Sequence, residues 1–164
     1  MGELTTAAVP PVGPDDHARG QGEVLIVYAD LGCPHCAAAW TRITEARARL
    51  VFRHFPVRSK HPRAPALHAA AEAAGLQGAF FEMVDSLFAD RGHHDDPHLW
   101  QRAERLGLDL ERFEADRRSE TVNDGIEEQF RSGIRAGVVT TPTQFVNGAP
   151  FPGVPGDALL AALS

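Results

Sequence analysis

The spacing of apolar residues changes several times along this chain, and each change marks a different predicted element. Val24–Tyr28 is a continuous apolar run rich in β-branched residues, which is typical of a strand covered on both faces. The helix predicted next has apolar residues at helical spacing: Cys36, Trp40, Ile43 and Leu50. Val51–Phe55 indicates a second strand that Pro56 ends. Residues 23–55 therefore predict one strand, helix, strand unit with a right-handed crossover.

Residues 62–137 are predicted to be almost wholly helical. Gly75 and Gly107 are stop signals for helices. The start signals are Asp96-Pro97, Asp109 and Ser119. Three amphipathic stripes support the prediction: Phe80, Val84, Leu87 and Phe88; Leu99, Ala103 and Leu106; and Val122, Ile126, Phe130 and Ile134.

A period of two returns after Gly137. Thr143–Val146, an Asn147-Gly148 turn and Ala149–Phe151 predict a tight hairpin. A final helix is predicted over roughly Pro155–Leu163. The outline is βαβ, then a block of helices, then ββα, which is an α/β fold.

The order of these segments predicts the domain organisation. Residues 1–22 are rich in Pro, Gly and Asp and are interpreted as an N-terminal arm, with a short edge strand near Leu4 to Ala8. Residues 23–61 and 138–164 are expected to form one α/β domain together. Residues 62–137 are expected to form an all-helical subdomain inserted into it.

Length and charge exclude several classes of protein. The 164 residues suffice for one domain with a real hydrophobic core. A net charge of −6 lacks the basic surface of a nucleic-acid-binding protein, so no nucleic-acid partner is expected. No segment approaches the roughly 20 apolar residues of a membrane span, and the first twenty residues show no signal-peptide pattern. We therefore expect no membrane insertion, and a cytoplasmic location unless a removed signal peptide directed the protein to the periplasm or outside the cell.

Both cysteines of the chain lie in the stretch Gly32-Cys33-Pro34-His35-Cys36. Pro34 suits the first position of a helix, so Cys33 is placed where unpaired N–H groups and the helix dipole stabilise a thiolate. His35 adds a hydrogen-bond donor or a positive charge. Cys36 begins the inward-facing stripe of the helix. We therefore expect an exposed Cys33 to react first and Cys36 to resolve the mixed disulfide.

The other interpretations of this cysteine pair are half of a zinc site and two inert thiols. Zinc needs four ligands and the chain has no further cysteine, so we expect neither a metal nor another cofactor. The His- and Asp-rich segment 93–98 is interpreted as a solvated loop that ends in a helix cap at Asp96. Trp40 is expected in the core. Three further histidines are expected at the surface or partly packed: His54, His61 and His68.

Several features together resemble the DsbA-type thiol:disulfide oxidoreductases of the thioredoxin superfamily. They are a strand that runs into Cys-Pro-His-Cys at a helix start, a helical insertion, and Thr-Thr-Pro-Thr-Gln-Phe-Val-Asn-Gly before a hairpin and a helix. The resemblance covers about Asp15 to Ser164 and extends to the insertion segments of bacterial members. It implies a thioredoxin fold with an inserted helical subdomain, and a cis peptide bond at Thr141-Pro142 beside the cysteines. Thr141 would then pair its backbone with an extended substrate.

The resemblance also implies an activity and its partners. The expected reaction is disulfide exchange through a Cys33 mixed disulfide that Cys36 resolves. The expected partners are protein thiols and disulfides or low-molecular-weight thiols, and a redox recycling partner. The expected site residues are Cys33, Pro34, His35, Cys36, Thr141 and Pro142. One departure stands out, because family members often carry a buried acid where this chain has Val27, and Asp30 is expected beyond the strand.

The direction of the reaction stays open. Stabilising the thiolate stabilises the reduced form, so Pro-His between the cysteines favours an oxidising pair. A reducing cytosol would instead keep a dithiol that serves as reductase, isomerase or stress-response protein. Kappa-type glutathione transferases share the insertion topology but generally use serine and lack the paired cysteines. The remaining alternative is a redox or metal sensor that uses Cys33 and Cys36 as a switch and binds a partner around Pro142.

Overall fold

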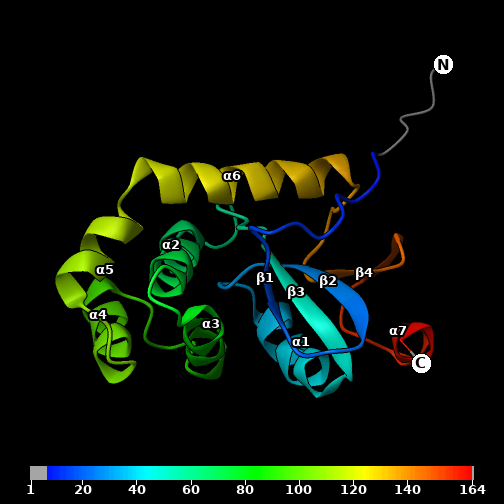
Figure 1. Ribbon diagram of the computed structural model, residues 1–164, viewed down its shortest axis with the longest axis horizontal. Helices are drawn as coiled ribbons and strands as arrows, with labels where there is room; N and C mark the ends of the chain where they lie inside the picture. Colours follow the sequence, from blue (N-terminus) through cyan, green and yellow to red (C-terminus); the bar gives the residue numbers. More distant parts are fainter. Residues whose placement is uncertain (1–6, 164) are drawn as a thin grey trace.

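The computed structural model describes residues 7–163, which form a five-stranded mixed sheet with helices on both sides (Figure 1). The elements in chain order are β1 (His17–Arg19), β2 (Glu23–Ala29), α1 (Pro34–Glu45), β3 (Ala48–His54), α2 (Ala64–Gly75), α3 (Phe80–Ala89), α4 (Asp96–Arg105), α5 (Leu110–Arg117), α6 (Glu120–Arg135), β4 (Thr143–Val146), β5 (Ala149–Pro152) and α7 (Asp157–Ala162). The strand order is β1-β3-β2-β4-β5. Among the strands within residues 7–163, only β2 and β3 pair in parallel. The predicted α/β fold class is confirmed.

The central strand β2 is apolar along its length because it is covered on both faces. Leu25, Val27 and Ala29 point into the larger core, which α1, α2 and α3 also fill. Ile26 and Tyr28 point into a second core on the opposite face. The continuous apolar run therefore reflects burial on both sides, as in other sheets with helices on both faces.

One boundary prediction is wrong at the end of α1. The helix ends at Glu45, and residues 48–54 pair with β2 as β3. Leu50 therefore belongs to a strand and not to the apolar stripe of the helix. Its position seven residues after Ile43 fits a helical period, but Leu50 also alternates with Ala48 and Phe52 toward the same core. Pairing with β2 decides between the two periods.

The edge strand also differs from the prediction. It is β1, which pairs antiparallel with β3, so Leu50 faces Arg19 and Phe52 faces His17. Of the segment predicted as an edge strand, Ala7 and Ala8 are not in a strand, and residues 4–6 lie outside the described part of the chain. Gly20, with a φ of 85°, helps to turn the chain from β1 into β2.

The five helices from α2 to α6 occupy the chain between β3 and β4. In Figure 1, α2, α3, α4 and α5 gather beside the sheet, α6 runs along its upper side and α1 lies below it. Helix α2 contacts α3, α5 and α6, and α6 also contacts β3. The helical block is thus packed onto the sheet, with α6 against β3.

Helix α6 approaches the sheet closely because residue 133 has no side chain. A Cβ atom at Gly133 would lie 2.7 Å from the ring of Phe55 and 2.9 Å from the ring of Tyr28. The neighbouring Ser132 forms a 2.8 Å hydrogen bond with the Tyr28 hydroxyl, and Phe130 packs its ring on Phe55. These contacts fix the C-terminal half of α6 against the sheet.

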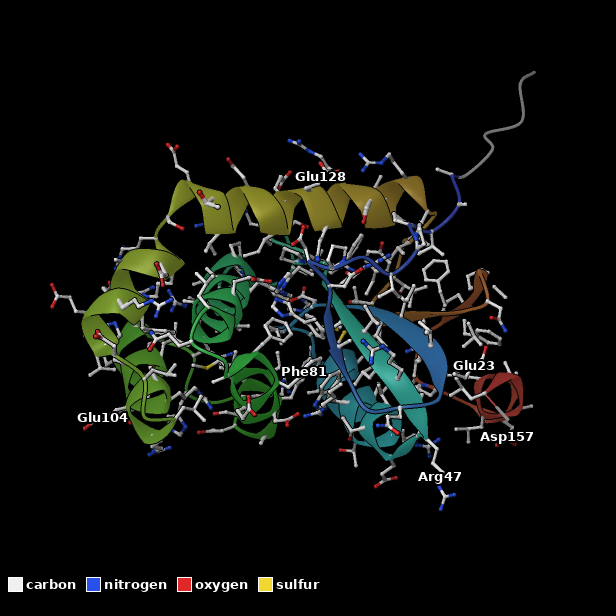
Figure 2. The ribbon with its side chains drawn as sticks, viewed as in Figure 1. Glu23, Arg47, Phe81, Glu104, Glu128 and Asp157 are labelled. Atoms are coloured by element: carbon white, nitrogen blue, oxygen red, sulfur yellow. The ribbon has the colours of Figure 1, made fainter. Side chains whose placement is uncertain are left out.

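The predicted helix starts at Asp109 and Ser119 are confirmed. The Asp109 carboxylate accepts a hydrogen bond from the Arg112 N–H at 2.9 Å, and the Ser119 hydroxyl accepts one from the Val122 N–H at 3.2 Å. The predicted cap at Asp96 is wrong, because Asp96 is the first helical residue of α4 and its carboxylate binds Arg63 instead. Polar side chains such as Glu104 and Glu128 point away from the core (Figure 2).

Candidate active site

Cys33 occupies the position at which α1 begins. It is the N-cap residue, with extended backbone (φ −87°, ψ 124°), and Pro34 is the first residue of the helix. Both Cys33 and Cys36 are free thiols. The expectation of an exposed Cys33 is wrong, because the residue is only 4% exposed. Thr141 lies against it, with the carbonyl oxygen 3.9 Å from the Cys33 sulfur.

The surroundings of Cys33 favour its thiolate. A hydrogen bond from the Cys36 thiol is the largest cause, and it lowers the pKa of Cys33 from 9.0 to about 5 although burial opposes the shift. Further hydrogen bonds come from the Thr141 side chain and from the backbone N–H groups of Cys36 and His35. The start of a helix supplies these N–H groups because they have no partner within the helix. Cys33 is therefore mostly ionised at neutral pH.

The surroundings of Cys36 favour its protonated thiol. Burial raises the pKa of its thiol, and the neighbouring Cys33 adds to the rise. One backbone N–H, that of Asp30, lies 3.4 Å from the Cys36 sulfur and partly offsets these effects. The pair therefore consists of the Cys33 thiolate and the buried Cys36 thiol, which donates a hydrogen bond to the Cys33 sulfur.

Asp30 is a buried carboxylate directly after the last residue of β2. Its Oδ1 accepts a hydrogen bond from the Gly32 N–H at 2.8 Å, and its Oδ2 accepts one from the Val57 N–H at 2.9 Å. The His61 Nδ1 atom lies 2.9 Å from Oδ2. Burial would raise the pKa of Asp30, but the Val57 and Gly32 N–H groups that donate to the carboxylate lower it. The carboxylate stays ionised in the interior.

The expected acid position on β2 is occupied by Val27, which lies directly across from Gln144 on β4. Gln144 is fully buried, and neither atom of its amide group has a hydrogen-bond partner within residues 7–163. Val27 lies in the same core as Cys36. The chain therefore has a buried carboxylate at Asp30, whose backbone N–H contacts Cys36, and a buried amide at Gln144 across from Val27, in place of an acid on β2.

A chain of hydrogen bonds connects the active-site loop with the helical block. The Leu31 N–H donates to His68 Nε2 at 3.0 Å, and the Nδ1 atoms of His68 and His54 lie 2.6 Å apart. Glu72 Oε1 lies 2.7 Å from His54 Nε2 and 2.8 Å from His17 Nε2. His54 and His68 are 1% and 0% exposed, so the expectation of surface or partly packed positions is wrong for both.

The partners of this chain determine where its protons lie. Because Leu31 donates to Nε2 of His68, the neutral ring carries its hydrogen on Nδ1 and donates it to His54. His54 then carries its hydrogen on Nε2 and donates it to the Glu72 carboxylate. Burial lowers the pKa of His68 to about 4, so its ring is neutral at neutral pH. Nearby histidines lower the pKa of Glu72 despite its burial.

A groove of about 580 Å³ opens beside Cys33, between α1, α6 and the loop before β4. The residues that line it are Cys33, Pro34, His35, Phe55, Val57, Lys60, His61, Phe130, Ile134, Val138, Val139, Thr140 and Thr141. Val139 is 91% exposed, which is unusual for an aliphatic side chain. The Thr141-Pro142 peptide bond at the end of the groove is cis.

The structure brings most of the predicted site residues together. Four of them line the groove: Cys33, Pro34, His35 and Thr141. Cys36 and Pro142 are buried beside it. The His35 side chain has no hydrogen bond or ion pair with the described residues and contributes through its backbone N–H. Sequence reasoning missed His61 as a groove residue, because it follows a turn and carries no local pattern.

Comparison with known proteins agrees with this fold and this site. The fold and the two cysteines at the start of α1 define a thioredoxin-fold protein with a Cys-x-x-Cys site. A family model described as "Thioredoxin" matches residues 16–162, so the chain belongs to this family. None of the helices within residues 7–163 is long and apolar enough to cross a membrane.

Solved structures share the fold over nearly the whole chain. A thioredoxin-like oxidoreductase from Silicibacter pomeroyi DSS-3 is 24% identical, with a TM-score of 0.79 and coverage of 91% of this chain and 90% of that one. The thiol-disulfide exchange protein alpha-DsbA2 from Wolbachia pipientis is 16% identical, with a TM-score of 0.78 and coverage of 90% and 84%. DsbA2 of Pseudomonas aeruginosa is 22% identical, with a TM-score of 0.73 and coverage of 93% and 94%.

The curated relatives include longer proteins that are named as Na(+)/H(+) antiporters. The Na(+)/H(+) antiporter NhaA 1 of Salinispora arenicola (strain CNS-205) is 43% identical over 150 residues, which are 84% of this chain and 22% of the antiporter. The Na(+)/H(+) antiporter NhaA of Herminiimonas arsenicoxydans is 37% identical over 156 residues, which are 89% of this chain and 25% of that protein. The chain thus spans about a quarter of the length of these relatives.

Proposed function

We propose that this protein is a thiol:disulfide oxidoreductase that exchanges disulfides with thiol-containing substrates. The observation that carries the proposal is the asymmetry of its two cysteines. Cys33, with a pKa of about 5, opens to a groove, whereas Cys36 is a buried thiol that donates a hydrogen bond to it. An ionised sulfur at neutral pH beside a protonated partner is what nucleophilic thiol chemistry needs.

In the reducing direction, the Cys33 thiolate attacks a substrate disulfide. One substrate sulfur forms a disulfide with Cys33 and the other leaves as a thiolate that takes up a proton. Cys36 then loses its proton and attacks the Cys33 sulfur, which releases the second substrate thiolate and forms the Cys33–Cys36 disulfide. In the oxidising direction the same steps run backward. Two electrons pass between the substrate and the cysteine pair in either case.

The low pKa of Cys33 favours the oxidising direction. Stabilising the thiolate stabilises the reduced pair, and each unit of pKa shift corresponds to roughly 30 mV in a two-electron potential. The pair is therefore proposed to give its disulfide to substrates and to depend on a redox partner that oxidises it again. This role suits an oxidising compartment such as the periplasm.

The groove supports a polypeptide substrate. Phe55, Phe130 and Ile134 give it an apolar wall, and Thr141, two residues before β4 begins, lies beside the Cys33 sulfur. An extended chain can pair with backbone groups at this position, in the manner of strand addition. Small thiols fit the same groove with fewer contacts.

Two substitutions test the proposal. Cys33→Ser removes the attacking sulfur and is expected to abolish oxidation of a reduced model peptide with two cysteines. Cys36→Ser leaves Cys33 reactive but removes the resolving thiol, so a mixed disulfide with the peptide is expected to accumulate and to appear in intact-protein mass spectrometry. Full peptide oxidation by the Cys33→Ser protein would refute the proposed function.

A redox sensor that uses the same cysteine pair is the second candidate. The chain of hydrogen bonds from Leu31 through His68 and His54 to Glu72 favours a sensor, because this chain connects the cysteine loop with the helical block. A sensor is oxidised once and changes a partner's binding, whereas an enzyme turns over. Oxidation of many equivalents of peptide in a glutathione buffer supports the enzyme, and a single equivalent supports the sensor.

A further inference from the structure

Asp30 and His61 form a carboxylate–imidazole pair beside the active cysteines. Their Oδ2 and Nδ1 atoms lie 2.9 Å apart. Asp30 is fully buried and its carboxylate also holds the N–H groups of Gly32 and Val57, so the acid cannot turn away from the histidine. An ionised carboxylate only accepts hydrogen bonds, so Nδ1 of His61 carries a hydrogen. In the neutral ring, the lone pair is then on Nε2.

His61 is held against the loop that carries Cys33. A Cβ atom at Gly32 would lie 2.9 Å from the Cβ of His61, so the histidine packs on the residue directly before Cys33. The imidazole is 22% exposed and lines the same groove as Cys33 and Thr141. Nε2 of His61 has no hydrogen bond with any of residues 7–163. The ring that carries this unbonded nitrogen therefore lies in the wall of the groove that a substrate thiol enters.

We propose that His61 is the general base for substrate thiols in this groove and that Asp30 is its positioning residue. This inference rests on the proposed disulfide exchange and concerns the step in which a substrate is oxidised. The substrate class it defines is an aliphatic thiol, such as a cysteine side chain, which is mostly protonated at neutral pH. Such a thiol is a poor nucleophile until a base removes its proton.

In the proposed step, the substrate S–H bond breaks and its proton passes to Nε2 of His61, while the substrate sulfur attacks Cys33 in the Cys33–Cys36 disulfide. A substrate–Cys33 disulfide forms, the Cys33–Cys36 bond breaks, and the electron pair stays on the Cys36 sulfur. Cys36 takes up a proton from water, and His61 returns its proton to water. The protein disulfide is the oxidant.

His35 also lines the groove, but the structure favours His61 for this role. The His35 side chain is exposed and has no hydrogen bond or ion pair with the described residues, so its ring has no fixed orientation. The carboxylate of Asp30 fixes the tautomer and the direction of the His61 ring. A base works efficiently only when its lone pair is held within hydrogen-bond reach of the proton.

Two thiols of different acidity test the proposal. The oxidised protein is mixed in a stopped-flow instrument with 2-mercaptoethanol, which is protonated at pH 7, or with 5-thio-2-nitrobenzoate, which is already ionised. His61→Gln is expected to slow the reaction with 2-mercaptoethanol about 100-fold, the lower range for general-base catalysis. The reaction with the thiolate is expected to keep its rate, since it has no proton to lose. His61→Asn provides a second variant, and His98→Gln, an exposed histidine outside the groove, is the control expected to keep both rates.

Each outcome has a distinct meaning. Selective loss of the 2-mercaptoethanol reaction in both His61 variants supports the proposal. Equal slowing with both thiols shows that His61 only shapes the groove, and unchanged rates show that it has no role; either result overturns the inference but leaves the proposed function intact. If the unmodified protein reacts with neither thiol, the proposed function fails and the inference fails with it.

Discussion

The Nδ1 atoms of His54 and His68 lie 2.6 Å apart in the interior, between β3 and α2. Only one of the two nitrogens can carry a hydrogen, and the Leu31 N–H on the far side of His68 assigns it to His68. A second proton would place two N–H groups against each other or take the acceptor from Leu31. Protonation of His68 at Nε2 therefore takes away the acceptor of the Leu31 N–H, and this makes the fold sensitive to acid.

The first prediction concerns the pH dependence of stability. Burial lowers the pKa of His68 from 6.5 to about 4, so between these values the unfolded chain binds a proton that the folded chain does not. The free energy of unfolding must therefore fall as the pH falls from about 6.5 to 4, by on the order of 3 kcal/mol from this residue. Urea unfolding at pH 7 and pH 4 measures the fall.

Substitutions isolate this contribution from that of other groups. His68→Gln removes the titrating ring but keeps a side chain that can accept from Leu31, so its stability is expected to fall less between pH 7 and pH 4. His98→Gln, which changes an exposed histidine, is expected to show the same fall as the unmodified protein. An equal fall in the His68→Gln protein would refute the assignment.

The second prediction concerns the acidity of Cys33. The hydrogen bond from the Cys36 thiol is the main reason why the pKa of Cys33 is about 5. A hydrogen bond to a charged group contributes about 1.5–3 kcal/mol, so Cys36→Ala is expected to raise the pKa of Cys33 by about one to two units. Cys36→Ser keeps a hydroxyl donor and is expected to raise it less. The rate of alkylation by iodoacetamide between pH 3 and pH 9 measures the pKa, and a value near 5 in the Cys36→Ala protein would contradict the prediction.

The third prediction compares two glycines on α6. Gly133 faces the rings of Phe55 and Tyr28, with less than 3 Å for a Cβ atom, whereas a Cβ atom at Gly125 would meet nothing within 4 Å. Gly133→Ala is expected to destabilise the protein by about 1–3 kcal/mol through overpacking. Gly125→Ala is expected to stabilise it by up to about 1 kcal/mol, because alanine favours a helix. Thermal unfolding distinguishes the two, and destabilisation by both substitutions would show that helix propensity is not decisive here.

The fourth prediction concerns the apolar wall of the groove. Ile134 lines it and is 53% exposed, and Leu76 is equally exposed, at 52%, outside the groove. Ile134→Ser is expected to raise the KM for a cysteine-containing peptide about tenfold, since burial of such a side chain is worth about 1.5–3 kcal/mol when complete. The rate with a small thiol should stay the same. Leu76→Ser should change neither rate, and a tenfold KM effect from Leu76→Ser would show that the effect is not local to the groove.

Sequence reasoning reached the α/β fold and the cysteine pair because both depend on local patterns. The apolar run of β2, the Asn147-Gly148 turn and Pro34 at a helix start are properties of a few neighbouring residues. The predictions were wrong at Leu50, which fits both a helical period and the alternation of a strand. They also missed the strand His17–Arg19, which has no apolar pattern of its own. In both cases pairing with a distant strand decides the structure.

Sequence alone placed Cys33 and Cys36 at the start of a helix, because proline chemistry and helix geometry operate over a few residues. Only the tertiary structure decided how acidic Cys33 is, which carboxylate lies near Cys36, and that His61 joins His35 at the groove. Asp30 and His61 lie 31 positions apart, and β3 runs between them before the chain returns to the active-site loop. The histidines at 54 and 68 are buried for the same reason, since α2 packs on β3 and removes both rings from water. Such contacts depend on the packing of whole elements, and no spacing within the sequence records them.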